Sequence, residues 1–196
     1  YEISECLVGS EMCIRDSPSD DMSTNYTPTY ALFHGTIGYT VECGENNEAS
    51  VTMGKYGLIG HTAYVAENKN GLYLNQLEFF RRALNNEESP ETEKWFVTQD
   101  NQVEENFREK DEYGKFYPEY YVIPTDAASQ RDIADAYFMQ EYFIRNGVQV
   151  EKLTQDVTVN GVTYKAGAFV IDMHQISRSF ANAVLYKGCL LYTSPS

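Results

Sequence analysis

Residues 119–187 constrain the fold most, because short strand-like runs alternate there with a well-marked helix. Residues 119–124 (EYYVIP) are rich in β-branched and aromatic side chains, which is typical of a strand. Ser129, followed three residues later by Asp132, predicts a capping box at the start of a helix that Gly147 ends. The further predicted elements are a strand at 148–153, a hairpin at 157–164, a strand at 168–172 and a helix at 177–187. Strand–helix–strand order predicts an α/β unit.

The hairpin prediction rests on the dipeptide Asn160-Gly161. It lies between two valine-rich runs, residues 157–159 and 162–164. Asn and Gly accept the left-handed backbone conformations that a two-residue hairpin turn requires. The sequence therefore predicts a two-residue hairpin turn at Asn160-Gly161.

The preceding part of the chain predicts one strand and two helices. Residues 31–41 (ALFHGTIGYTV) predict a strand, again from their β-branched and aromatic content. Residues 51–66 and 72–84 predict two helices, and the second has an apolar face made of Leu74, Leu77, Phe80 and Leu84. Residues 86–118 are charged and poor in aliphatic side chains, which indicates a surface connection between two domains.

Composition narrows the class of protein. The 196 residues include 29 acidic and 15 basic side chains, a net charge of -14. Binding to nucleic-acid phosphates needs clustered Lys and Arg, so we expect no nucleic-acid partner. No apolar run reaches the roughly 18 residues of a membrane helix, so we expect no transmembrane segment. The 16 Tyr and 10 Phe argue against wholesale disorder.

The two ends of the chain resemble translations of one DNA tag. Residues 189–196 (CLLYTSPS) would be encoded by TGTCTCTTATACACATCTCCGAGC, and the reverse complement of that DNA, read from its third base, encodes SEMCIRD, the sequence of residues 10–16. The tag resembles the transposase adapter used in shotgun sequencing libraries. We therefore expect residues 1–17 and 189–196 to be adapter artefacts without function, and the rest to be a metagenomic fragment. Cys43 is the one cysteine outside these ends, so no disulfide framework is predicted.

The strongest candidate for chemistry lies in residues 33–44 (FHGTIGYTVECG). Glu42 ends an apolar run beside the glycine turn at Gly44, where a carboxylate is partly desolvated but reachable by substrate. Desolvation moves a carboxyl pKa toward the range that a general base needs. A solvated or capping Glu42 is the alternative that the residues alone leave open.

A family resemblance supports the catalytic interpretation. GYTVE (residues 38–42) resembles the segment with the catalytic glutamate in zinc carboxypeptidases of the carboxypeptidase A type, peptidase family M14. The region with Gly57, Leu58 and Gly60 resembles the end of that catalytic domain. Residues 121–153 and 164–185, which include AGAFVIDMHQ, resemble the domain that follows it in many bacterial members.

The resemblance implies the end of a carboxypeptidase-like α/β catalytic domain at 18–90, a connection at 91–118 and a small α/β accessory domain at 119–188. It further implies a C-terminal fragment of a bacterial metallopeptidase. The substrate would be a peptide or cell-wall peptide that loses its C-terminal residue, and a secreted or periplasmic location is favoured.

By the same resemblance, Glu42 is the general base and Zn²⁺ is the cofactor. A catalytic zinc site needs three protein ligands and an open position for water. The family takes two ligands from an HxxE motif and the third from a later histidine. No HxxE occurs here, and His34 is only eight residues before Glu42. We therefore expect the ligands to lie upstream in the full-length parent, and this fragment alone to be inactive.

Two other classes remain open. Cys43 could be the nucleophile of a cysteine hydrolase or amidotransferase, with His174 as base and an acid to orient it. Against this, Val41 stands where a nucleophile elbow has glycine, and Gly44 is adjacent to the cysteine. The third class is a non-catalytic binding module with a tyrosine-rich surface. For the three histidines, His34, His61 and His174, we expect structural, hydrogen-bonded roles, and the alternative for His34 is a place in the active-site cleft.

Overall fold

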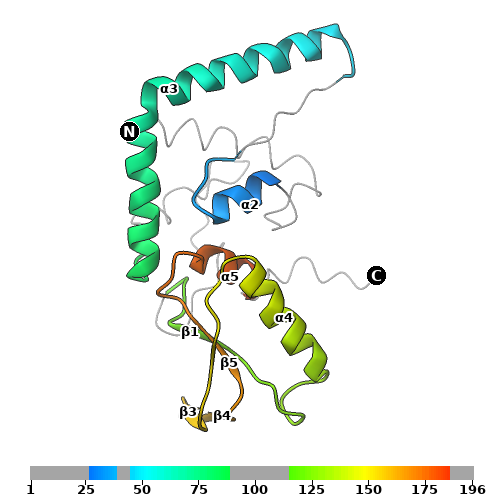
Figure 1. Cartoon of the computed structure of the whole chain (residues 1–196), viewed down its shortest axis with the longest axis vertical. Helices are drawn as coiled ribbons and strands as arrows, with labels where there is room; N and C mark the ends of the chain where they lie inside the picture. Colours follow the sequence, from blue (N-terminus) through cyan, green and yellow to red (C-terminus); the bar gives the residue numbers. More distant parts are fainter. Residues whose placement is uncertain (1–26, 39–44, 89–114, 186–196) are drawn as a thin grey trace, which may run out of the picture. The chain divides into compact units, whose positions relative to one another are not determined.

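The structure is a computed structural model that describes residues 27–38, 45–88 and 115–185 (Figure 1). The chain divides into two compact units, residues 1–80 and residues 81–196, and we describe each by itself. Helices and two small antiparallel sheets make up the described residues. The mixed α and β composition predicted from the sequence is therefore confirmed.

The first unit begins with a helix where the sequence predicts a strand. Helix α2 spans Thr27–Phe33, so the prediction of a strand over 31–41 is wrong for its described residues, 31–38. Pro28 fits the first turn of a helix, where its missing N–H is not needed. One turn apart, the rings of Tyr30 and His34 stack with their centroids 4.3 Å apart, a contact that helical geometry provides.

Helix α3 spans Glu48–Leu84 as one element of 37 residues, where the sequence predicts two helices. The segment between the two predicted helices contains Gly71 but no proline, and a lone glycine is tolerated inside a helix. The Asn68 side chain donates a hydrogen bond of 2.9 Å to the carbonyl of Tyr64, four residues earlier, which is one helical turn away. Figure 1 shows the helix changing direction partway along its length.

The predicted apolar face of this helix is only partly buried. Phe80 packs with its ring edge-on to Phe79, at a centroid distance of 5.7 Å. Leu74, Leu77 and Leu84 are instead exposed. Sequence periodicity therefore located the helix but overestimated the burial of its face.

The second unit is a small sheet with two helices, as the sequence predicts. Strand β5 (Phe169–Asp172) is central, and β1 (Tyr120–Ile123) and β2 (Glu151–Lys152) flank it, both antiparallel to it. Strands β1 and β2 therefore run in the same direction. Helix α4 (Ile133–Arg145) connects them in a split βαβ arrangement, and α5 (Arg178–Leu185) follows β5.

The predicted hairpin is confirmed as a separate two-stranded sheet. Strands β3 (Val157–Val159) and β4 (Val162–Tyr164) are antiparallel, and Val159 pairs with Val162. Asn160 and Gly161 form the turn, with φ values of 50° and 79°. These left-handed conformations are those that the Asn-Gly pair is expected to supply.

Helix α4 is capped differently from the prediction. Asp132 is the N-cap, and its side chain accepts a hydrogen bond of 2.8 Å from the Ala134 amide. Ser129 instead belongs to the preceding turn, where its hydroxyl donates to Asp126. The predicted capping box at Ser129 is therefore wrong, because the two carboxylates cap successive turns. Gly147, with φ of 78°, follows the helix end as predicted.

The core of the second unit lies between the sheet and its helices. Its fully buried large side chains are Phe143, Phe180, Ile171 and Met173. The ring of Tyr142 on α4 lies 5.8 Å from that of Phe180 on α5, and Tyr137 meets Phe169 edge-on at 5.2 Å. Both helices therefore contribute to one apolar core.

Candidate functional site

Glu42 and Cys43, the two residues with predicted catalytic roles, lie outside the described residues. The structure does describe the segment that leads toward them, from His34 to Gly38. Gly35 has φ of 73°, and its carbonyl accepts a hydrogen bond of 2.9 Å from the Gln76 side chain on α3. A Cβ atom at Gly35 would lie 2.8 Å from Phe80 Cε1, so glycine is required there.

Gly38 makes a second close approach. A Cβ atom at this position would overlap the backbone of Pro28 in the first turn of α2. Backbone cannot move aside as a flexible side chain can, so a side chain at residue 38 would displace the segment. Two glycines thus hold residues 35–38 against the helices of the first unit, four residues before Glu42.

His34 and His61 have similar local partners. His34 Nδ1 lies 2.8 Å from the Tyr30 carbonyl oxygen, and His61 Nδ1 lies 2.8 Å from that of Gly57. A carbonyl oxygen can only accept, so Nδ1 carries the proton in both rings. These bonds agree with the structural roles expected for the two side chains.

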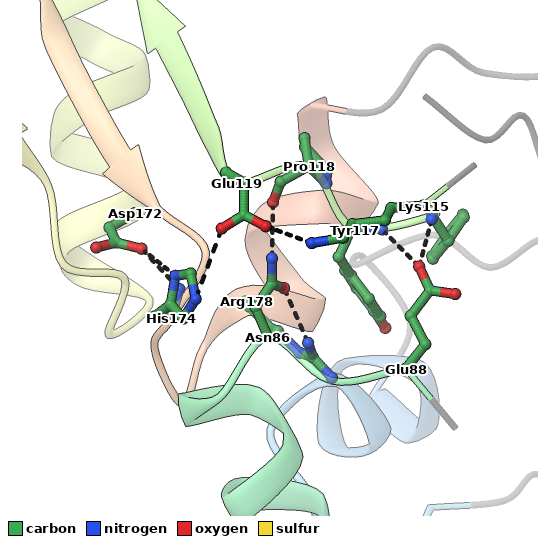
Figure 2. A network of polar contacts seen from close by, with 10 residues as sticks. Asn86, Glu88, Lys115, Tyr117, Pro118, Glu119, Asp172, His174 and Arg178 are labelled. Atoms are coloured by element: carbon green, nitrogen blue, oxygen red, sulfur yellow. Dashed lines mark hydrogen bonds and ion pairs between the residues drawn. The ribbon is translucent and has the colours of Figure 1, made fainter. Parts of the chain in front are cut away.

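In the second unit, His174 lies between two carboxylates (Figure 2). Its Nδ1 atom is 2.9 Å from Asp172 Oδ1, and its Nε2 atom is 3.6 Å from Glu119 Oε2. The Asp172 carboxylate also accepts a 2.8 Å hydrogen bond from the His174 backbone amide. Lys115 donates a 2.5 Å hydrogen bond to the other oxygen of Glu119. The cluster joins the start of β1 to the end of β5.

This arrangement has the elements of an oriented base. A carboxylate at Nδ1 fixes the orientation of the ring, and the Glu119 carboxylate faces its Nε2 atom from the other side. The side chains of His174, Asp172 and Glu119 are 38%, 44% and 48% exposed, so solvent reaches all three. The alternative with His174 as a base left its acid partner unnamed, and Asp172 is the carboxylate that lies at its Nδ1 atom.

A second polar cluster surrounds Arg178 on α5 (Figure 2). Its Nη1 donates to Asn86 Oδ1 at 2.9 Å, Nη2 donates to the Glu87 carbonyl, and the guanidinium lies 4.1 Å from the centre of the Tyr117 ring. Asn86 also donates a 3.1 Å hydrogen bond to the Pro118 carbonyl. Burial lowers the pKa of Arg178, while electrostatic interactions with Tyr117 and Glu88 act in the opposite direction and raise it.

Adjacent to this cluster, Glu88 accepts hydrogen bonds from the backbone amides of Phe116 and Tyr117. The Tyr121 hydroxyl donates a 2.7 Å hydrogen bond to Asn182 on α5. Burial, with a smaller contribution from Tyr117, raises the pKa of Tyr121 to about 12. The contacts of Glu88, Tyr121 and Arg178 were not predicted from the sequence. The available signal was Arg178 as the single charged residue in the sequence of α5.

The next feature is the grouping of potential metal ligands in the part of the chain that the structure describes. Among them, no group of three or more His, Cys, Asp or Glu side chains could hold a metal ion. The described residues therefore do not form the three-ligand site that a catalytic zinc needs. None of the helices in these same residues is long and apolar enough to span a membrane.

Comparisons with family models, curated proteins and solved structures gave no match for this chain.

Proposed function

We propose that the chain is part of a zinc metallocarboxypeptidase-like hydrolase of the M14 type, with Glu42 as its general base. The resemblance of residues 38–42 and of residues 121–185 to that family supports the proposal. Residues 18–90 then correspond to the end of the catalytic domain, and residues 119–188 to the small α/β accessory domain. The zinc ligands come from sequence that precedes residue 18 in the full-length parent.

The structural observation that favours this function is the anchoring of the segment before Glu42. Gly35 is bound by Gln76 and packed against Phe80, and Gly38 is packed against Pro28. A general base works only within hydrogen-bond reach of its proton, so its backbone must be held in position. The close glycine contacts at Gly35 and Gly38 provide such support for the segment that precedes Glu42 in the sequence.

The proposed substrate is a peptide or a cell-wall peptide with a free C-terminal carboxylate, acted on in a secreted or periplasmic setting. The family resemblance of residues 38–42 supports this substrate class.

The deciding experiment compares two single variants of the full-length parent. Glu42→Gln preserves size but removes the proton acceptor, so we expect peptidase activity to fall by about 10²–10⁴-fold. Zinc content and folding should stay unchanged. Cys43→Ser is the matched control at the neighbouring position and should keep most activity. Full activity in a folded, zinc-loaded Glu42→Gln protein would reject Glu42 as the base.

A cysteine hydrolase is the second candidate, and the Asp172–His174 pair favours it. The 2.9 Å contact at Nδ1 is the base–acid geometry that such an enzyme needs. In that case Cys43→Ser and His174→Gln would each abolish hydrolysis, and Glu42→Gln would leave it intact. The same assay therefore separates the two classes.

A further inference from the structure

Three Asn-Gly pairs occur in the sequence: Asn70-Gly71, Asn146-Gly147 and Asn160-Gly161. Asn-Gly is chemically labile, because no side chain on glycine hinders the attack of its backbone nitrogen on the asparagine amide. The nitrogen bonds to the side-chain Cγ, the Cγ–Nδ2 bond breaks, and ammonia leaves with the displaced proton. Water then opens the resulting succinimide at either carbonyl, which gives aspartate or isoaspartate.

The backbone conformations of two of these pairs oppose the reaction. Gly71 lies inside α3, where backbone amides donate to the carbonyls one turn earlier. At the end of α4, the Gly147 amide donates a 3.1 Å hydrogen bond to the Ile144 carbonyl. The Asn146 side chain donates one of 2.8 Å to the Tyr142 carbonyl. In both places the attacking glycine amide is part of a helix or of its C-terminal cap, and at the second the asparagine side chain is held as well.

Asn160-Gly161 lies in a different setting. Val159 pairs with Val162, so both turn residues are outside the ladder of paired strand residues. They are exposed, and nothing lies within 4 Å of the Cβ position of Gly161. Strands β3 and β4 form a sheet of their own, and a lone two-stranded hairpin is at best marginally stable in water. This turn should therefore open locally far more often than the middle of a helix.

We propose that Asn160 is a site of spontaneous succinimide formation, through local opening of the β3–β4 hairpin, and that Asn70 and Asn146 are protected. The isoaspartate product adds a methylene group to the main chain. A two-residue turn has no room for it, so the modified hairpin loses the Val159–Val162 register.

The test is peptide mapping by mass spectrometry on the intact chain, kept folded in mildly alkaline buffer. We expect the Asn160 peptide to gain the mass of one amide-to-acid conversion at least roughly tenfold faster than the other two, since their opening is rarer. The product should separate into an aspartate and an isoaspartate form. Equal rates at Asn160 and Asn146, or no conversion at Asn160, would overturn the proposal.

Two controls test the opening step. In denaturant all three pairs should react at similar rates, because each asparagine is then followed by an unstructured glycine. Asp156 closes the base of the hairpin, where its carboxylate accepts from Lys165 Nζ at 2.8 Å and from the Ala166 amide at 2.9 Å. Asp156→Ala should therefore raise the rate at Asn160 without changing that at Asn146. An unchanged Asn160 rate in this variant would reject hairpin opening as the route.

Discussion

The Arg178 guanidinium donates a hydrogen bond of 2.9 Å to the Asn86 side-chain oxygen across 92 residues of sequence. Asn86 has φ of 48° just after α3, and its side chain also binds the Pro118 carbonyl. Three distant segments of the second unit therefore meet at one arginine. Its partners are an amide oxygen, a carbonyl and an aromatic ring, so its positive charge is buried mainly among neutral groups.

Replacing Arg178 with methionine should destabilise the second unit. The variant keeps the apolar stem but loses both hydrogen bonds and the contact with Tyr117, for an expected decrease of about 1–3 kcal/mol in unfolding free energy. Chemical denaturation measures this change. The matched control is Arg145→Met, at an exposed ion pair with Glu141, where the expected change is within about 1 kcal/mol. Equal losses in the two variants would contradict the role assigned to Arg178.

Tyr121 should make the second unit sensitive to alkali. Its pKa is raised from 10.0 to about 12 in the folded chain, so its neutral form favours folding. That contribution is fully present below pH 10 and is lost as the pH rises through about 12. Unfolding free energy measured across this window should fall more steeply in the unmodified chain than in Tyr121→Phe. Tyr56→Phe, at an exposed tyrosine, should leave the slope unchanged.

Adding a methyl group at Gly35 should disturb the segment before Glu42. Alanine is strained at φ of 73°, and its Cβ would press on Phe80, so Gly35→Ala should destabilise the first unit by about 1–3 kcal/mol. Gly57→Ala in α3 has the opposite expectation. Nothing lies within 4 Å of its Cβ position, and alanine favours a helix by about 0.5–1 kcal/mol. Thermal melts would show whether the two changes have opposite signs.

Zinc should bind weakly or not at all to the chain shortened to residues 18–188. His34 and His61 each use Nδ1 in a local hydrogen bond, and no three-ligand group exists among the described residues. Titration calorimetry with Zn²⁺ alone measures the affinity. Stoichiometric binding at micromolar affinity or tighter would contradict the expectation that the ligands lie upstream.

The second unit was largely predictable because its local signals agree with its tertiary contacts. The Asn160-Gly161 turn, the glycine after α4 and the short β-rich runs each specify one conformation. Ser129 misled the prediction only because two potential caps, Asp126 and Asp132, occur close together. Local agreement of this kind is what lets a sequence specify a structure.

The first unit was harder because its composition and its conformation disagree. The strand prediction drew on the β-branched and aromatic residues 36–41, whereas residues 31–33 (ALF) complete a helix that begins at Thr27. The break expected between 66 and 72 is absent because no strong helix breaker stands there. In the candidate site, His174 and Asp172 are only two positions apart, so their contact could have been predicted from the sequence. The Arg178–Asn86 contact has no local signature in the sequence.

The order of strands in the second unit has a consequence for its biosynthesis. Strand β5 is central, yet it is the last of the three to leave the ribosome. Among the described residues, β5 is the ladder partner of both β1 and β2, so β1 stays unpaired while residues 124–168 are added and β2 while residues 153–168 are added. Sheet closure thus waits for Asp172, and a translational pause before that residue would leave two unpaired strands available to chaperones or to other chains.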